Sequence, residues 1–423
     1  MLKHIYISRL LPSSSFLPSG TVIASTISRR TINNNLKIER DLMACGAATG
    51  VCTAFGAPIG GMLFALEEGA SHWSPSLTWH TFFGCMISFA CLLILDTVGT
   101  SYGKVGLGEL FSFGRFDDSG SSDGSNGDDM ISFAIIELPI FAILGAIGGL
   151  VGACFNAMNA KITRWRIKRV HHSKMLRAVE VLILSSLVTT VSFLLPLLFG
   201  ECRTLPSTDD LPVNHKSILN EFVSFNCKKG VEYNEMASLI FTDAGSAVHL
   251  LFHAGVDAFS PSSLIVFAVL YLSLASLVYG IAVPSGLFVP SLLGGAALGR
   301  LFGMTLRSST LLHDVIVGSS GGGTRFLALP NAYALIGAAS VLGGMARMTV
   351  SLTVILLECT GNQQFVLPLM ISLMMARLTG GLFNEDLYHV SLLCSLVCGL
   401  EVFSLTLFRI LFYRFPNRSL CSN

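Results

Sequence analysis

One segment of this sequence has the residue types that a reversible anion site would need. Gly286-Leu287-Phe288-Val289-Pro290 opens a stretch rich in small residues that is expected to be a helix. The first turn of a helix presents backbone N–H groups without intrahelical partners, together with the positive end of the helix dipole. Such groups bind an anion weakly, because no full positive charge holds it. The alternative is that the segment marks only the start of a helix.

Carboxylates and a tyrosine supply the other candidate chemistry. Glu67 and Glu68 end an apolar stretch, where an ionisable side chain at membrane depth usually handles protons or ions. If the pair lies at a cytosolic rim instead, it is solvated and ordinary. Tyr388 follows a short acidic turn, Asn384-Glu385-Asp386, and its hydroxyl could face an anion. The alternative for Tyr388 is an interfacial tyrosine without a function in binding.

Composition places these residues in a membrane. Of 423 residues, 52% are hydrophobic and 13% are charged, which is about half the charged share of a soluble domain. The mean hydropathy is +0.67. The net charge of +1 gives no electrostatic reason to expect a nucleic acid as partner.

Signals for metals and cofactors are weak. The 11 cysteines include no CxxC pair, and most lie in apolar runs, where cysteine behaves as a small hydrophobic side chain. His249 and His253 are four residues apart, but without the glutamate of an HExxH motif they indicate helix packing rather than zinc. The Gly318–Gly323 run lacks the Gly-Lys-Ser/Thr of a phosphate loop. We therefore expect that the protein binds no metal or cofactor and is not an enzyme.

Apolar stretches of spanning or near-spanning length recur along the chain and predict an all-α polytopic protein. They run at roughly 42–66, 78–98, 132–158, 177–199, 236–254, 262–283, 286–306, 332–357, 365–383 and 390–413. Several are interrupted by Gly or Pro, as at Gly56-Ala57-Pro58. Broken helices at membrane depth expose backbone groups, which only surrounding protein or a water-filled cavity can satisfy. The interruptions therefore indicate a transport path.

Charged loops predict the orientation of the chain. The linker from Lys161 to Arg177 carries seven basic residues, which places it in the cytosol. The acidic, Ser/Gly-rich loop 101–131 lies one span away and is expected to be luminal or external, and the loop at 200–232 is expected on that same side. Cys202 and Cys227 share the second loop and would form a disulfide if it faces a lumen or the outside.

The sequence contains an internal repeat. Residues 46–67 align without a gap with residues 337–358, at an offset of 291. The two copies share an initial Gly-Ala-Ala and a final Leu-Glu. Two Gly/Ala-rich helix pairs, each ending in a carboxylate, are typical of the duplicated halves of transporters. The alternative is that small-residue membrane helices resemble one another by composition alone.

Taken together, these motifs resemble the CLC family of chloride channels and proton/chloride antiporters, and especially its endosomal and lysosomal branch. The segments that carry the likeness are 56–71, 155–159, 285–291, 346–354 and 380–388, and it covers roughly residues 16–390. The resemblance implies a CLC-type inverted-repeat bundle of tilted, broken helices, with the first repeat incomplete. It also implies a homodimer in the lipid bilayer with one pore in each subunit.

The resemblance also implies roles for individual residues. Gly286, Leu287 and Phe288 would bind chloride through backbone N–H groups, and Tyr388 would add its hydroxyl. Glu68, with Glu67 beside it, would take protons from the cytosolic side. The implied function is that of a voltage-gated chloride channel or a proton-coupled chloride antiporter in an endosomal, lysosomal or vacuolar membrane.

Two departures from the family pattern accompany this likeness. Ser13 stands where the family has a gating glutamate, and a serine cannot carry a proton. The apolar end of the chain does not resemble the CBS domains of eukaryotic members. An alternative is therefore a truncated, non-transporting subunit that dimerises with full-length partners. The expected regions are an atypical N-terminus with a basic linker (1–40), the rest of the first repeat (41–100), the acidic loop (101–131), the second repeat (132–388) and an atypical tail (389–423).

Overall fold

A computed structural model provides the structure of the chain. The residues that it describes are 20, 21, 23, 24, 26, 27, 36–69, 74–101, 137–170, 173–205, 221–228, 231–255, 258–281, 286–308, 330–361 and 363–384. Ser13, Tyr388, nearly all of the acidic loop and the expected tail 389–423 lie outside these residues.

The described residues are almost entirely helical, as the sequence predicts. The helices before the acidic loop are α3 (Leu36–Phe55), α4 (Pro58–Phe64), the π-helix η1 (Ala65–Gly69) and α5 (Pro75–Ser101). Those that follow are α6 (Leu138–Arg169), α7 (Lys174–Phe199), α9 (Glu235–Phe241), α10 (Ala244–His253), α11 (Pro261–Val278), α12 (Phe288–Ser308), α14 (Pro330–Ala346), α15 (Val350–Thr360), the 3₁₀ turn η5 (Gln363–Phe365) and α16 (Val366–Phe383).

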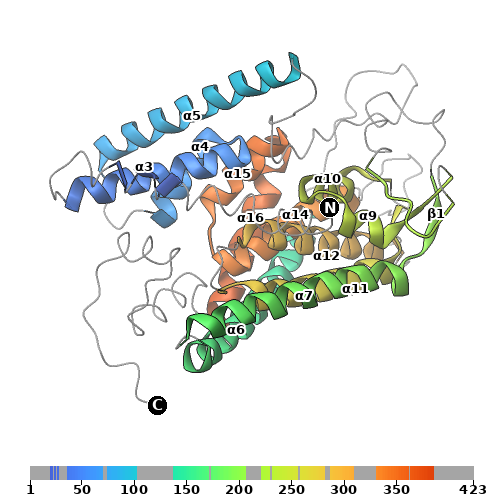
Figure 1. The fold of residues 1–423 in the computed structure, drawn as a ribbon. Helices are drawn as coiled ribbons and strands as arrows, with labels where there is room; N and C mark the ends of the chain where they lie inside the picture. The colour runs from blue at the N-terminus through green and yellow to red at the C-terminus, as the bar shows by residue number, and fades with distance from the viewer. Residues whose placement is uncertain are drawn as a thin grey trace, which may run out of the picture.

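The helices form one bundle in which segments far apart in the sequence pack together (Figure 1). Helix α5 lies along one edge, and α7 and α11 lie along the opposite edge. Between them, α14 packs against α6, α12 and α16, and α15 packs against α4. The centre of the bundle is therefore built from α12 and α14, whose side chains are mostly buried.

Glycines allow the two central helices to approach closely. A Cβ added to Gly299 in α12 would lie 2.8 Å from the Cα of Gly337 in α14, and one added to Gly337 would lie 2.4 Å from the Cα of Gly299. Neither distance is compatible with a side chain. Small residues at a helix crossing are the usual packing device in a membrane, where close backbone contact replaces the hydrophobic effect between helices.

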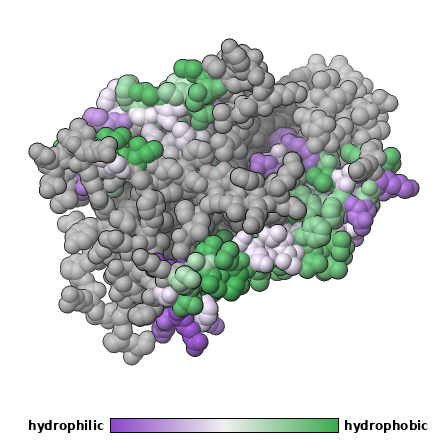
Figure 2. Space-filling view, viewed as in Figure 1, coloured by the Kyte–Doolittle hydropathy of each residue, from purple (hydrophilic) through white to green (hydrophobic). Residues whose placement is uncertain are grey.

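The structure supports the expected multi-pass architecture. Among the described residues, six helices are long and apolar enough to cross a membrane, namely the segments Pro75–Leu95, Leu138–Arg169, Met175–Phe199, Pro261–Val278, Phe288–Ser308 and Gln363–Phe383. Figure 2 shows apolar side chains along the face that α7 contributes, with hydrophilic residues gathered near both of its ends. This distribution fits a helix that crosses an apolar layer between two polar surfaces.

Both copies of the internal repeat form a helix, a break and a shorter helix. The break falls at Gly56 between α3 and α4, and at Arg347 between α14 and α15. These residues are equivalent at the offset of 291, and both adopt a positive φ, 64° and 59° respectively. Glycine adopts this conformation readily, whereas an arginine there is unusual. The shared backbone geometry makes similarity by composition alone an inadequate explanation of the repeat.

The expected single stretch at 236–254 is instead two short helices, so this prediction was wrong. Helix α9 ends at Phe241 and α10 begins at Ala244. The Asp243 side chain accepts a hydrogen bond from the Gly245 amide (3.4 Å) and so caps the start of α10. An aspartate that bonds to the backbone two residues ahead favours a helix start over a helix interior, and this local preference divides the apolar run.

A small two-stranded antiparallel sheet, which the sequence analysis did not predict, stands at the far end of α7. Strand β1 (Cys202–Thr204) pairs antiparallel with β2 (Glu232–Asn234), with Cys202 opposite Asn234. The structure joins Cys202 to Cys227 in a disulfide, with Cα atoms 5.9 Å apart. Arg203 of β1 forms an ion pair with Glu235, which is fully buried at the start of α9.

Candidate functional site

The candidate anion site lies at the start of α12. Gly286 is half-buried, Leu287 is buried, and the helix begins at Phe288. The Ser291 hydroxyl donates to the carbonyl oxygens of Leu287 and Phe288, each at 2.8 Å, and thereby tightens the first turn. The amides of this turn have no acceptor within the helix, because no earlier helical carbonyl exists. At this site, backbone amides that lack intrahelical acceptors therefore lie inside the protein.

Apolar side chains from both repeats surround this helix start. Leu287 belongs to a buried cluster with residues of α6, α11 and α14, including Phe155 and Met345. The Phe288 ring lies 5.5 Å from the Phe55 ring and 6.2 Å from the Phe64 ring. Phe55 ends α3 and Phe64 ends α4, so the remainder of the first repeat meets the second repeat here. The structure thus brings the Phe288 segment close to the helix that leads to Glu67 and Glu68.

Glu67 is engaged with the start of another helix. Its carboxylate accepts hydrogen bonds from the Thr349 amide and hydroxyl (2.8 Å each) and from the Ser351 amide and hydroxyl (2.9 and 2.6 Å). These four donors lie at the N-terminus of α15, where a negative charge is favourable. Glu67 is therefore not an ordinary solvated rim residue, and its role in proton transfer stays a prediction. The carboxylate is a helix cap.

Glu68 is half-buried and follows directly in the π-helix η1. The wider winding of a π-helix changes the directions in which successive side chains leave the backbone, and such turns occur often at functional sites. A role of Glu68 in proton transfer stays a prediction.

The chain that leads to Tyr388 is anchored at the end of α16, although Tyr388 itself lies outside the described residues. Arg347 donates to the carbonyl oxygens of Gly380 (3.1 Å) and Asn384. The Asn384 side-chain amide donates to the Ala153 carbonyl of α6 at 2.7 Å. Two elements of the second repeat therefore fix the chain four residues before the candidate tyrosine.

Sequence reasoning missed two polar residues on the flank of this site. Asn159 and Arg166 of α6 bond to the carbonyl oxygens at the end of α11. The sequence analysis counted Arg166 only as one of the basic residues of the linker. A signal was nevertheless present, because Phe155, Asn159 and Arg166 are spaced by four and seven residues and so share one face of a helix.

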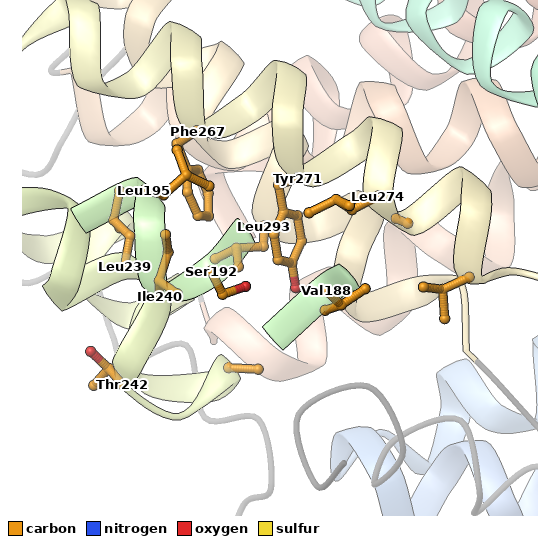
Figure 3. Close-up of a pocket in the computed structure, with 13 residues that line it drawn as sticks. Val188, Ser192, Leu195, Leu239, Ile240, Thr242, Phe267, Tyr271, Leu274 and Leu293 are labelled. Carbon is orange, nitrogen blue, oxygen red and sulfur yellow. The ribbon is translucent and has the colours of Figure 1, made fainter. Parts of the chain in front are cut away.

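A separate cavity of about 50 Å³ lies between α7, α9, α11 and α12 (Figure 3). Figure 3 shows the hydroxyl groups of Ser192, Thr242 and Tyr271 among apolar side chains such as Phe267 and Leu293. None of its lining residues carries a charge, and none belongs to the candidate anion site. Among the described residues, no group of three or more His, Cys, Asp or Glu could hold a metal ion.

The broken and repeated helix pairs, together with the six helices of spanning character among the described residues, define a multi-pass membrane protein of the inverted-repeat transporter class. The family model described as "Voltage gated chloride channel" matches residues 15–381. The chain therefore belongs to the voltage gated chloride channel family, the CLC family.

Individual relatives agree with this assignment. The chain is 38% identical over 389 residues to "H(+)/Cl(-) exchange transporter 7" of Mus musculus, covering 88% of this chain and 44% of that relative. It is 37% identical over 358 residues to "Chloride channel protein CLC-d" of Arabidopsis thaliana, covering 83% and 42%. These relatives are named as transporters and channels, not as enzymes. The chain spans less than half the length of either.

Solved structures share the fold. A "slow cyanobacterial Cl-/H+ antiporter" aligns with a TM-score of 0.60 at 19% identity, covering 90% of this chain and 70% of that chain. A "eukaryotic CLC transporter" aligns with a TM-score of 0.54 at 22% identity, covering 89% and 51%. Together with the repeated helix pairs, these alignments confirm the predicted CLC-type inverted-repeat fold.

Proposed function

We propose that this protein moves chloride across a membrane through a site at the start of α12. The observation that carries the proposal is the helix start at Phe288, which lies inside the protein with the amides of its first turn lacking intrahelical acceptors. A site of backbone dipoles suits a transported anion, because binding is favourable but an ion can still leave. Family membership supports chloride as that anion.

Replacement of Phe288 by proline tests the role of its amide. Proline removes the N–H group but is tolerated at the first position of a helix, so Phe288→Pro deletes one donor while α12 can still form. Phe288→Ala is the matched control, because it loses the same ring contacts with Phe55 and Phe64 but keeps the amide.

The measurement is chloride efflux from vesicles reconstituted with the purified full chain. We expect efflux from the wild-type protein, and a half-saturating chloride concentration about 10- to 100-fold higher in Phe288→Pro than in Phe288→Ala, the range for one hydrogen bond to a charged group. Absence of efflux from folded wild-type protein contradicts the proposal. Equal chloride dependence in the two variants would mean that the Phe288 amide does not bind the anion.

We further propose that Glu68 couples this movement to protons. Several relatives are named exchange transporters, and Glu68 is a half-buried carboxylate beside the capped Glu67. Against strict coupling stands Ser13, which by resemblance occupies the gating position and cannot titrate. A measurement of the pH change during chloride efflux decides between proton-coupled and uncoupled chloride movement. Proton movement that is present in the wild type and lost in Glu68→Gln supports coupling, and efflux without proton movement in the wild type rejects it.

The family also supports a homodimer in an endosomal, lysosomal or vacuolar membrane. Helix α5 at the edge of the bundle exposes large apolar side chains, with Trp79 66% and Phe83 57% exposed. We propose that a second subunit covers part of this face. A purified mass of two chains after subtraction of detergent, measured by light scattering, supports the dimer, whereas a mass of one chain contradicts it.

A further inference from the structure

Arg166 is the most heavily engaged charged residue of α6, although it lies in the segment that the sequence marks as a basic linker. Arg166 is only 6% exposed. One guanidinium nitrogen, Nη1, donates to the Tyr279 carbonyl at 2.9 Å, and Nη2 donates to the Leu277 carbonyl. The third nitrogen, Nε, donates to Oε1 of Glu180 in α7 at 2.5 Å. The side chain therefore joins α6, α7 and the end of α11.

The carbonyl groups that Arg166 binds are those that a helix end leaves without partners. Helix α11 ends at Val278, so the carbonyl oxygens of its last turn have no intrahelical donor. Asn159, about two turns before Arg166, donates from Nδ2 to the carbonyls of Ser276 (3.1 Å) and Tyr279 (3.0 Å). Two side chains of α6 thus cap the end of α11.

The capped helix end leads directly to the candidate anion site. Gly280 follows Tyr279 with a φ of 88°, a conformation that suits glycine, and the chain turns there. Leu287 lies only seven residues further along the sequence. On the far side of this short segment, Leu287 packs in one buried cluster with Phe155, which lies on the same face of α6 as Asn159 and Arg166. One helix face therefore contacts the chain just before and just after the turn.

Glu180 neutralises the positive charge of Arg166, which limits any direct attraction of Arg166 for an anion. The ion pair balances the guanidinium charge, and both side chains are mostly buried, with 8% and 14% of their surfaces exposed. A guanidinium charge that is balanced in this way exerts little net attraction on an anion. The contribution of Arg166 is therefore geometric: its planar fork meets two carbonyls and one carboxylate at once, which a lysine ammonium cannot do.

We propose that Arg166, assisted by Asn159, is a positioning residue for the anion site. By fixing the end of α11, it sets where the amides of Leu287 and Phe288 lie. This inference rests on the proposed function for its effect on transport, but its effect on the backbone is independent of transport.

The test separates the role of Arg166 as a clamp from its role in balancing Glu180. Arg166→Gln removes both roles. Glu180→Gln is the matched control, because it leaves the bonds from Arg166 to Leu277 and Tyr279 in place. The double variant Arg166→Gln/Glu180→Gln removes the clamp without leaving a carboxylate unbalanced. Arg166→Lys keeps the charge but loses the fork.

The first measurement is the chloride dependence of efflux from reconstituted vesicles. We expect the half-saturating chloride concentration to rise about tenfold in Arg166→Gln, in Arg166→Lys and in the double variant, which is the change for a free-energy loss of about 1.4 kcal/mol. Glu180→Gln is expected to keep the wild-type value. Recovery of the wild-type value in the double variant overturns the inference, because Arg166 would then serve only to balance Glu180.

The second measurement is amide hydrogen exchange in detergent-solubilised protein. The Tyr279 amide donates to Ala275 and the Ser291 amide donates to Leu287, so both report on the two ends of the segment. We expect faster exchange at both positions in the double variant and unchanged exchange in α14. Unchanged exchange at Tyr279 and Ser291 in folded variants overturns the inference. If the wild type carries no chloride, the proposed function fails, and exchange alone decides whether Arg166 orders this region.

Discussion

Glu67 and Glu358 occupy equivalent positions in the two repeats, and each carboxylate caps the first turn of the short helix in the other repeat. Glu67 accepts from the Ser351 amide at 2.9 Å, and Glu358 accepts from the Gly60 amide at 2.8 Å. Gly60 and Ser351 are themselves equivalent at the offset of 291. The relationship is therefore reciprocal, as a two-fold axis between the repeats requires.

This exchange of caps explains how two short helices remain in place. Helix α4 has seven residues and α15 has eleven, lengths at which an isolated helix is marginal. Each gains a carboxylate at its positive end, and the two helices pack against each other. Because Glu67 is joined to Glu68 in η1, the same contact also holds the segment of the proposed proton carrier.

Removal of the two caps is expected to destabilise the protein unequally. Glu67→Ala strands the amides of Thr349 and Ser351 and two hydroxyl groups, whereas Glu358→Ala strands the amides of Ile59 and Gly60. A buried donor left without a partner costs about 1–3 kcal/mol, and the exposed Ile59 amide loses less because water can replace the carboxylate. We expect both variants to melt below the wild type, with Glu67→Ala the lower, as measured by the loss of the monodisperse peak after heating in detergent.

The control for the cap variants is Leu66→Ala, which truncates a neighbouring side chain that is 43% exposed. It is expected to melt close to the wild-type temperature. Equal melting of Glu67→Ala and Leu66→Ala would mean that the four hydrogen bonds of Glu67 contribute nothing to stability.

Added volume at the crossing of α12 and α14 is expected to be harmful at one glycine and harmless at another. Gly299→Ala places a methyl group 2.1 Å from the Tyr333 carbonyl oxygen, which the packed backbone cannot relieve locally. Overpacking of this kind costs about 1–3 kcal/mol. In contrast, a Cβ at Gly381 in α16 meets nothing within 4 Å among the described residues. Gly381→Ala is therefore expected to raise the melting temperature slightly, because alanine favours the helix by up to about 1 kcal/mol.

Melting of both glycine variants in one detergent checks this prediction. A melting temperature of Gly299→Ala at or above that of Gly381→Ala would show that α12 and α14 do not cross at Gly299 as described.

The disulfide and the basic linker are expected on opposite sides of the membrane, since they lie at opposite ends of α7. In sealed vesicles whose luminal or external face is turned outward, an impermeant reductant followed by an impermeant thiol reagent should label Cys202 and Cys227. A single cysteine placed at Lys168 in the linker should react only after the membrane is opened. Labelling of both sites from the same side would contradict this topology.

The sequence predicted much of the helical framework because the relevant signals are local. Apolar length predicted 262–283 and 286–306, and the structure has α11 at Pro261–Val278 and α12 at Phe288–Ser308. Repetition of the sequence predicted paired halves, and Gly56 marked one of the two breaks. The second break, at Arg347, carries no local signal, since an arginine there does not indicate a positive φ.

Contacts between distant segments were beyond sequence reasoning. The donors that engage Glu67 lie more than 280 residues away, so its function as a cap could not be separated from a function in proton transfer. Arg166 looked like a solvated linker residue because its carbonyl partners carry no sequence signature. The strands β1 and β2 have three residues each, too few for the alternation of apolar and polar residues that identifies a strand.

Alkaline pH is expected to destabilise the region of the two-stranded sheet through Tyr233 in β2. The side chain is buried and its hydroxyl donates to the Ala258 carbonyl at 2.8 Å. Burial, reinforced by the negative charge of Glu235, raises the pKa of Tyr233 from 10.0 to about 12. Between these two values the unfolded chain has lost the proton and the folded protein still holds it. Stability that depends on the neutral phenol is therefore complete below pH 10 and declines as the pH rises through 12.

Tyr233→Phe separates this effect from the titration of the other tyrosines. The variant loses the hydrogen bond to Ala258, so it should melt below the wild type at pH 8. It also has no phenol to ionise, so the difference between the two proteins should shrink steadily between pH 10 and pH 12. A difference in melting temperature that stays constant across this range would show that Tyr233 titrates in the folded protein as it does in the unfolded chain. The hydroxyl would then have to be open to water, in conflict with the burial of the Tyr233 side chain.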